Sequence, residues 1–524
     1  MDNSTVDNPS GITSPIPEEV IVRHDEEHAY GYIIEVLTRG LYHIKSHVIR
    51  EYIQNGYDAV LELRRRGLDS GDGKIEVRVE PPSIFIYDNG IGMDAVRINE
   101  YRYVGHSRKL THESVGFRGI GKLSGISVAD QIIVSTSPVG LPQRHRLIFN
   151  ARAMLTRVEQ LKAFGENISL NQLIREYTAL ETEDEEADAH YTLVELFNVH
   201  SDSRSLLDVK SLSEYLSLTA PVDFHPDFRY GAQLDQDLRK YVNDYDTVPL
   251  YLNGERIYKL FLPNSKSPGQ LFVFPSDSQT ERRHIAYCWY CENADKGQFG
   301  DKIRQGFIYR VKNFSVGDNQ LPRITLWETT PERSFYFFGE IHVCDIGVIP
   351  SADRSNFEQN DARDRLYKMG TATISRQLNL IAGTSSDVRR AREFIAQAEA
   401  KVTTIAQAAE SGEIPTELAV PKIIELNSAV ENVEKRLKKA PESHKERGKS
   451  VVQKGKKLID TLNPGTRQKV DRSPTYDIKS DLGFDQQATW VYESIVEVLR
   501  TKLRADEFEK ILLAIHQKLG RKQK

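Results

Sequence analysis

The stretch REYIQNGYDAV, at residues 50–60, decides the fold of the N-terminal part of the chain. Glu51, Asn55 and Asp58 stand at positions i, i+4 and i+7, so on a helix all three side chains project from one face. A carboxylate beside an amide oxygen can bind a hard cation and can deprotonate a water molecule. An amphipathic helix with a solvated polar face is the alternative that this stretch alone leaves open.

A second motif, DNGIGM at residues 88–93, follows two predicted strands in residues 75–88. Asp88 ends the second of these strands, and Gly90 and Gly92 come next. Because glycine has no side chain, the carboxylate should face a cleft whose floor is bare backbone. Such a carboxylate can accept a hydrogen bond from an exocyclic amine.

A third motif, GFRGIGK at residues 116–122, precedes a predicted short helix and a strand. Glycine amides that converge ahead of a helix form a nest for phosphate oxygens. One such glycine motif often marks only a tight turn. All three motifs in this order indicate a nucleotide-binding site.

These motifs resemble the N box and the two glycine boxes of the GHKL superfamily, which groups DNA gyrase B, the ninety-kilodalton heat-shock chaperone, sensor histidine kinases, MutL and MORC proteins. The resemblance implies a Bergerat-type ATP site in an α/β sandwich, with helices on one face of a mixed sheet. The predicted domain order is most similar to the chaperone branch and its prokaryotic chaperone-like ATP-binding relatives.

The resemblance also implies a role for each matching residue, with ATP and Mg²⁺ as cofactors. Glu51 would be the general base, Asn55 the magnesium ligand and Asp88 the adenine-binding carboxylate. Thr192, in a later strand, would reach the adenine edge through water. The positions expected to contact the nucleotide are Asn55, Asp58, Asp88, Gly90, Gly92, Met93, Ser107, Lys109, Gly116, Phe117, Arg118, Gly119, Ile120, Gly121, Lys122 and Thr192.

Glu51 distinguishes the branches of this superfamily. The histidine kinases usually lack a glutamate at this position, whereas the hydrolysing branches carry it, so the sequence predicts ATP hydrolysis. The basic interval at residues 94–115 corresponds to the lid that folds over bound ATP. A solvated surface helix is the alternative for that interval.

The composition is that of a soluble multidomain protein: 524 residues, 28% charged and 39% hydrophobic, with a net charge of −5. A net charge this close to neutral does not indicate nucleic acid as a partner. Residues 1–19 are polar, and no apolar run reaches the length of a membrane span, so we expect no membrane association and a cytoplasmic location.

The cysteines are too few for a disulfide framework. Cys288 and Cys291 have the spacing of metal ligands, but they lie in a run with strand character and lack a second ligand pair. A buried strand is the better interpretation.

We expect an α/β fold in which a Bergerat-type sandwich is followed by an α+β transducer-like domain and then by a helical region. The predicted divisions are an N-terminal tail at 1–28, a GHKL ATPase domain at 29–222, a middle domain at 223–385, a helical hairpin at 386–440, a basic linker at 441–475 and a helical segment at 476–524. The acidic run at 181–188 is expected to be a solvated loop, and a hairpin that turns at Asn253 and Gly254 is assigned to the middle domain.

The loop at residues 349–357 resembles the catalytic loop of the chaperone, which makes Arg354 a second catalytic candidate. It would contact the γ-phosphate. An ion pair with a carboxylate such as Asp361 is the structural alternative.

The sequence therefore predicts an ATP-hydrolysing conformational machine, a homodimer that closes on ATP and acts on protein clients. A MORC- or MutL-like nucleic-acid clamp is the main alternative, because residues 435–472 carry thirteen Lys or Arg and only four Asp or Glu. A nucleotide-sensing scaffold is a further alternative.

Overall fold

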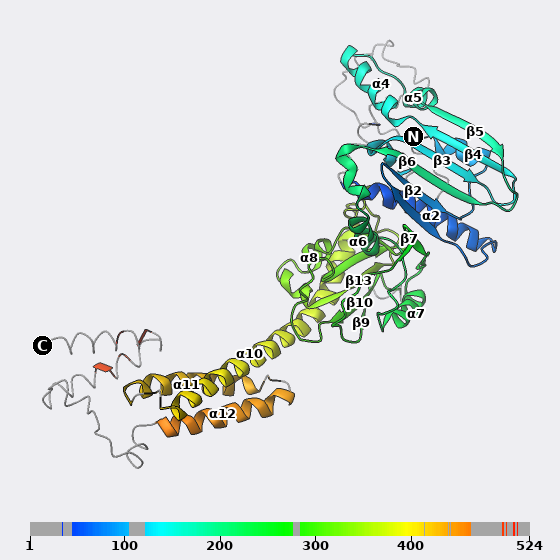
Figure 1. The fold of residues 1–524 in the computed structure, drawn as a ribbon. Helices are drawn as coiled ribbons and strands as arrows, with labels where there is room; N and C mark the ends of the chain where they lie inside the picture. The colour runs from blue at the N-terminus through cyan, green and yellow to red at the C-terminus, as the bar shows by residue number, and fades with distance from the viewer. Residues whose placement is uncertain are drawn as a thin grey trace, which may run out of the picture.

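The computed structural model describes residues 44–103, 121–275, 283–412, 416–438 and 442–462, together with a few single positions outside these ranges. An α/β domain comes first, a second domain with its own sheet follows, and a long helix leads to a helical bundle (Figure 1). This arrangement confirms the predicted fold class. None of the described helices is long and apolar enough to cross a membrane.

The first sheet has eight strands in the order β5-β4-β3-β6-β2-β1-β7-β8. All neighbouring pairs are antiparallel except β1 and β7, so the sheet is mixed. The strands are β1 (Ile75–Glu80), β2 (Ser83–Asp88), β3 (Ala129–Ser137), β4 (Gln143–Phe149), β5 (Thr178–Asp184), β6 (Tyr191–Val199), β7 (Leu250–Leu252) and β8 (Glu255–Ile257).

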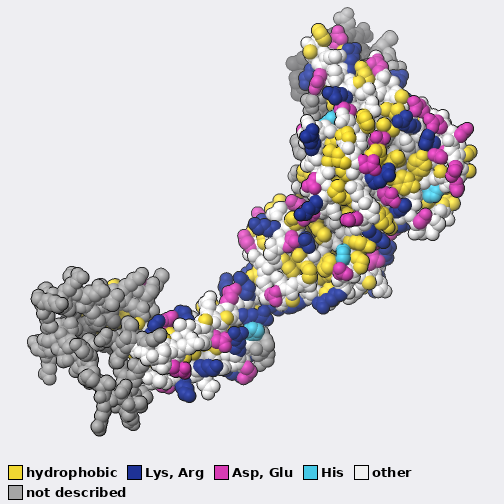
Figure 2. All heavy atoms as spheres, viewed as in Figure 1, with side chains coloured by type: hydrophobic (Ala, Val, Ile, Leu, Met, Phe, Trp, Pro, Cys, Tyr) yellow, Lys and Arg dark blue, Asp and Glu magenta, His cyan; other side chains and the backbone are white. Residues whose placement is uncertain are grey.

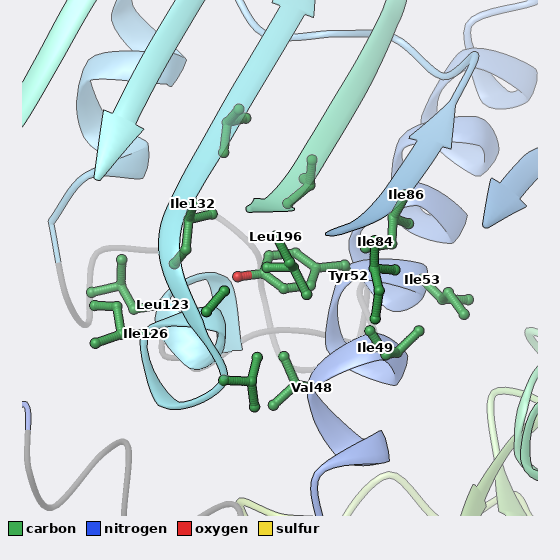
Figure 3. Close-up of a cluster of buried hydrophobic side chains, with 14 of the residues drawn as sticks. Val48, Ile49, Tyr52, Ile53, Ile84, Ile86, Leu123, Ile126, Ile132 and Leu196 are labelled. Carbon is green, nitrogen blue, oxygen red and sulfur yellow. The ribbon is translucent and has the colours of Figure 1, made fainter. Parts of the chain in front are cut away.

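Helices cover one face of this sheet. They are α2 (Ser46–Arg65), α3 (Ala95–Tyr101), the 3₁₀-helix η3 (Gly121–Ser127), α4 (Ala151–Phe164), α5 (Leu170–Glu176), η4 (Ser201–Leu207) and α6 (Val209–Thr219). The apolar side of α2 packs on the sheet, and Figure 3 shows Tyr52 at the centre of this core, among Ile84, Ile132 and Leu196. Burial of this apolar surface fixes α2 against the sheet.

The acidic run expected to be a loop is in part a strand, β5, at the edge of the sheet. Glu181 and Glu183 lie opposite Arg146 and Arg144 of β4 and form ion pairs with them. Opposite charges in directly facing positions stabilise strand pairing, which explains why an acidic segment is a strand here.

The hairpin at 250–257 was assigned to the middle domain, but the structure places it in the first sheet. β7 pairs with β1 in parallel, and the amide of Ile75 donates to the carbonyl of Pro249 at 2.8 Å. Asn253, at the turn, accepts from the amide of Val79 through its side chain at 2.8 Å. The hairpin thereby covers an edge of β1 that would otherwise expose unpaired backbone groups.

The second domain is built on a five-stranded sheet in the order β12-β11-β13-β10-β9. Its elements are α7 (Gly231–Tyr241), β9 (Gly269–Val273), β10 (Ala286–Glu292), β11 (Gly306–Val311), β12 (Phe314–Val316), α8 (Gln320–Leu326), the 3₁₀-helix η5 (Pro331–Tyr336), β13 (Phe337–Val343) and α9 (Asp361–Gly370). We call it the middle domain.

Cys288 and Cys291 lie in β10, which confirms the strand interpretation. Both side chains are buried, and burial raises the pKa of each thiol, that of Cys291 to about 12. Within the described residues, no group of three or more His, Cys, Asp or Glu could hold a metal ion.

A short π-helical turn, η6 (Thr371–Ser375), leads from α9 into α10 (Arg376–Glu410). With α11 (Thr416–Leu437) and α12 (Glu442–Leu462), α10 forms a three-helix bundle (Figure 1). The expectation of a basic linker at 441–475 is therefore wrong for residues 442–462. Gly448 and Gly455 of α12 allow close helix packing, because a Cβ at residue 448 would stand 2.5 Å from Leu437 and one at residue 455 would stand 2.5 Å from Val430.

Candidate active site

The first and third motifs meet at Glu51 and Gly121. Gly121, at the start of η3, lies so close to α2 that a Cβ atom built there would overlap Oε2 of Glu51. Tyr52, the next residue of α2, maintains this contact: its hydroxyl donates to the carbonyl of Lys122 at 3.1 Å and accepts from the amide of Gly125 at 3.1 Å. The Glu51 side chain is only 12% exposed, so its carboxylate lies in a partly desolvated position.

The second motif meets the first at Asp88 and Gly56. Asp88 is 7% exposed, and a Cβ at residue 56 would stand 3.0 Å from the Cβ of Asp88. The sequence analysis missed Gly56. Its signal was a glycine inside a helical pattern, which costs about 1 kcal/mol relative to alanine unless close packing requires it.

The backbone from Gly90 to Met93, which we call the floor, lies against α2 and β3. The amide of Ile91 donates to the carbonyl of Ala59 at 3.2 Å, and a Cβ at Gly90 would stand 2.6 Å from Ala59. Gly92 has a φ of +66°, and a Cβ there would overlap the carbonyl oxygen of Ser137. Only glycine fits at residue 92, since both its conformation and its contact exclude a side chain.

Thr192 lies directly opposite Asp88 in the β2–β6 pair. Next to it is Thr136 of β3, a buried residue that the sequence analysis missed. Its hydroxyl accepts from the amide of Met93 at 3.0 Å. A threonine in a strand is too ordinary to be singled out from sequence, so no signal pointed to it.

Residues 42–163 match the family model described as histidine kinase-, DNA gyrase B-, and HSP90-like ATPase. This match identifies the first domain as GHKL-type. Similar curated proteins include the chaperone protein HtpG of Psychromonas ingrahamii, 26% identical over 147 residues, which are 23% of this chain and 23% of the relative. The HtpG proteins of Yersinia enterocolitica and Yersinia pestis are 28% identical over 132 residues, 21% of each chain. The chain thus matches less than a quarter of the length of these relatives, and the match supports the predicted resemblance to the chaperone branch.

Two predicted nucleotide contacts of the GHKL-type domain, Lys122 and Asp58, also have neighbours outside the three motifs. Lys122 donates from Nζ to the carbonyl of Glu100 at 3.4 Å and lies over the ring of Tyr101. Asp58 is buried and lies near Lys312 of the middle domain; burial lowers the pKa of Lys312, and the Asp58 carboxylate opposes this shift. The expected roles of Lys122 and Asp58 at the nucleotide stay predictions.

Several expected site residues lie outside the part of the chain that the structure describes. They are Ser107, Lys109, Gly116, Phe117, Arg118, Gly119 and Ile120. Most of the interval expected to form the lid falls in the same stretch. Their expected contacts with phosphate therefore stay predictions.

The loop that carries Arg354 contacts the N-terminal part of α2. Nη2 of Arg50 donates to the carbonyl of Asp353 at 2.7 Å and also lies 4.0 Å from Oε1 of Glu51. The Asp353 carboxylate shapes the loop by accepting from Ser351 and Ser355. Burial would raise the pKa of Asp353, but these hydrogen bonds outweigh it and lower the pKa.

Arg354 itself is buried, with a φ of +55°. Its guanidinium lies over the ring of Phe314, 5.7 Å from the centroid, and Phe314 packs edge-on against Tyr57 of α2 at 5.2 Å. The loop is therefore docked on the same helix that carries Glu51 and Asn55. Whether Arg354 reaches a phosphate stays a prediction.

The described residues fit ATP and Mg²⁺. Asp88 supplies a buried acceptor beside a floor of bare backbone, which suits the amine edge and the face of a purine. Asn55, half-buried on α2 between Glu51 and Asp58, offers an amide oxygen of the kind that Mg²⁺ accepts.

Proposed function

We propose that the GHKL-type domain binds ATP with Mg²⁺ and hydrolyses it to ADP and phosphate. The observation that carries this proposal is the convergence on α2, where Gly121 lies against Glu51 and Asp88 lies against Gly56. Glu51 and Gly56 are five residues apart on α2. The proton-accepting carboxylate and the point where Asp88 of β2 meets the helix are therefore about 7 to 8 Å apart along the helix axis.

In this proposal Glu51 takes a proton from the attacking water. Its carboxylate is partly desolvated and has Arg50 at 4.0 Å, so its orientation is restrained on one side by a cation and on the other by Gly121. Asn55 would hold the magnesium ion, which would supply positive charge to stabilise the phosphates. Preorganised groups of this kind act mainly by stabilising charge that develops in the transition state.

Arg354 is the proposed contribution of the middle domain. Its loop already contacts Arg50, the residue next to Glu51, because Arg50 donates to the carbonyl of Asp353. A small rearrangement of this loop would bring a cation toward the phosphates, and the contact would strengthen as charge moves onto the leaving group. The nucleotide would thereby couple the two domains.

We further propose that the chain acts as a homodimer on protein clients, by analogy with the chaperone branch. The alternative of a nucleic-acid clamp rested on the basic segment at 435–472. Part of that segment is α12, in which Arg447 and Lys456 pair with Glu399 and Glu434 of the other bundle helices. Positive and negative side chains are also interspersed over the face of the molecule in Figure 2. Both observations favour a protein client.

ATP binding is tested by calorimetry on the wild-type chain and on Asp88→Asn. The variant loses a charge-assisted hydrogen bond and turns an amide donor toward the adenine amine, which should cost about 2 to 4 kcal/mol of binding free energy. Asp130→Asn is the control, because Asp130 lies in the same sheet and pairs with Arg152 instead. Wild-type affinity in Asp88→Asn would show that this pocket does not bind the base.

Hydrolysis is tested by comparing Glu51→Ala with Glu183→Ala. Glu183 lies in β5 at the edge of the first sheet and pairs with Arg144, away from the converging motifs. Glu51→Ala should bind ATP and turn it over about 10² to 10⁴-fold more slowly, whereas Glu183→Ala should behave as wild type. Unchanged turnover in Glu51→Ala would favour the nucleotide-sensing scaffold.

The clamp alternative has its own measurement. The chain is titrated with fluorescent duplex DNA at two salt concentrations, with and without residues 435–472. Micromolar, salt-sensitive binding that disappears with this segment would support the clamp over the protein client.

A further inference from the structure

We infer that Thr136 is a positioning residue that holds the floor beneath the base, and that its hydroxyl sets the preference for adenine. This inference rests on the proposed function, because it concerns the same nucleotide site. Thr136 belongs to none of the three motifs. It lies in β3, 43 positions after Met93, the last residue of the floor.

The floor is held at every residue. The carbonyl of Gly90 contacts Nδ1 of His190 at 3.0 Å, and the carbonyl of Ile91 accepts from the amide of Val139 at 3.1 Å. Gly92 lies directly on the backbone of Ser137. The fourth contact, from the amide of Met93 to Oγ1 of Thr136, comes from a side chain that is 0% exposed. Two of these contacts come from side chains, His190 and Thr136. Asp88 adds another, because its Oδ1 accepts from the amide of Gly90 at 3.0 Å. Thr136 is the fully buried side chain that holds the Met93 end of the floor.

Thr136 also belongs to a polar row that crosses the sheet. Asp88 of β2 faces Thr192 of β6, and Thr192 faces Thr136 of β3. Because directly opposite residues project from the same face of a sheet, the base-recognising carboxylate and the two hydroxyls lie side by side. The Thr136 and Thr192 oxygens are 3.2 Å apart.

One hydroxyl satisfies two groups here. Oγ1 of Thr136 donates to the carbonyl of Tyr191 at 2.8 Å while it accepts from the amide of Met93. It therefore joins the floor to the strand that carries Thr192. A valine of nearly the same shape would leave the half-buried Met93 amide without this acceptor, and an amide that loses its partner shifts to recover one.

The consequence concerns which base is bound. Asp88 can only accept hydrogen bonds when ionised, so it favours the amine of adenine over the carbonyl oxygen that guanine presents at the equivalent place. This discrimination depends on the distance between the base and the carboxylate, which the floor sets. A displaced floor should weaken ATP binding more than GTP binding, and the catalytic groups near Glu51 should be unaffected.

The experiment compares Thr136→Val and Thr136→Ser with the wild-type chain. Dissociation constants for ATP and GTP, ATP turnover and thermal unfolding are measured for each. Thr136→Val should raise the ATP dissociation constant about tenfold and lower the ATP-to-GTP preference by a similar factor, with turnover at saturating ATP within about twofold of wild type. Thr136→Ser keeps the hydroxyl and should restore both values to within about threefold.

Thr178→Val is the matched control, because the Thr178 hydroxyl also donates to a carbonyl, that of Ile174, but at the far edge of the same sheet. It should bind both nucleotides as wild type does. Equal ATP-to-GTP preference in Thr136→Val and wild type would overturn the inference, as would failure of Thr136→Ser to restore it. If the wild-type chain binds no ATP, the proposed function fails first, and that result is visible before any Thr136 variant is measured.

Discussion

Gly121 lies directly against the carboxylate of Glu51, and a Cβ atom at residue 121 would overlap Oε2 of Glu51. Seventy positions separate these residues in sequence, and the Tyr52 hydroxyl bonds to Lys122 and Gly125 keep them together. The glycine of the third motif therefore has a second role besides an expected phosphate contact. It leaves the space that the proposed general base occupies.

Gly121→Ala should lower ATP turnover, because the new methyl group must displace the Glu51 carboxylate. We expect a decrease of about 10² or more in turnover, with an ATP affinity much closer to wild type, since a base that is misplaced by about 1 Å loses most of its effect. Steady-state turnover and calorimetry measure the two quantities. Gly383→Ala is the control, because Gly383 lies in a helix with open space around it. Equal turnover in Gly121→Ala and wild type would contradict the assignment of Glu51.

Asn55→Ala should affect binding more than chemistry. The amide oxygen is a cation ligand and not a proton acceptor, so its loss should weaken the magnesium-dependent part of ATP binding. Titrations with ATP in the presence of Mg²⁺ and of EDTA measure this part directly. Glu51→Ala, one helical turn away, should keep the difference between the two titrations. An Asn55→Ala chain with an unchanged magnesium dependence would exclude Asn55 as a ligand.

Arg354→Ala should lower turnover and leave ATP affinity within a few-fold of wild type. A contact with the γ-phosphate that forms on loop rearrangement acts mainly in the transition state. Because Arg354 also packs on Phe314, thermal unfolding must be measured beside turnover. Arg363→Ala, which removes an arginine paired with Asp364 in the same domain, is the control. A loss of stability without a loss of turnover would leave Arg354 with a purely structural role.

The middle domain should lose stability below neutral pH because of His342. Burial, with Lys259 and Arg310 nearby, lowers the pKa of His342 to about 4, although its Nε2 lies 3.0 Å from Oε2 of Glu340. An unfolded histidine titrates near 6.5, so between pH 6.5 and 4 the unfolded state binds a proton that the folded state does not. The free energy of unfolding therefore falls as the pH is lowered through this window, by about 2 to 3 kcal/mol from this residue.

Urea unfolding at pH 7 and pH 4.5 measures this effect. It is followed by tryptophan fluorescence, to which Trp289 contributes from beside Glu340, because its indole donates to that carboxylate. His342→Gln should show a smaller difference between the two pH values. His284→Gln is the control, since His284 is half-buried, contacts the carbonyl of Tyr241 through Nε2 and packs against the rings of Phe272 and Phe274. A pH dependence identical in His342→Gln and wild type would contradict the prediction.

The parts of the fold that sequence could predict follow from local chemistry. The polar face of α2, the strand before Asp88 and the glycines after it each have a pattern that one element explains. Gly56 and Thr136 could not be predicted, because their importance lies in contacts with residues 32 and 43 positions away. The first contact depends on how α2 packs on β2, and the second depends on which residue of β3 reaches the floor. The pattern of one element specifies neither.

The wrong predictions, for β5, for the hairpin β7–β8 and for α12, also arise from contacts between residues distant in sequence. The acidic strand β5 and the hairpin β7–β8 take their places from neighbours in the sheet, Arg144 and Arg146 for the first and β1 for the second. The helix α12 could not be predicted from its composition, which is strongly basic. Its buried side consists of a few apolar residues and two glycines. Tertiary context overrode composition in each case.

The long helix α10 would amplify small rotations of the middle domain into larger displacements of the helical bundle. Ser385 of α10 donates to Glu292 of β10, which anchors the start of the helix on that domain. The helix continues to Glu410, about 37 Å farther at 1.5 Å per residue. As a stiff lever, it would turn a rotation of about 10° at the anchor into a displacement of about 6 Å at the bundle. A small rotation of the middle domain would thereby become a movement at the bundle of about the length of one helical turn.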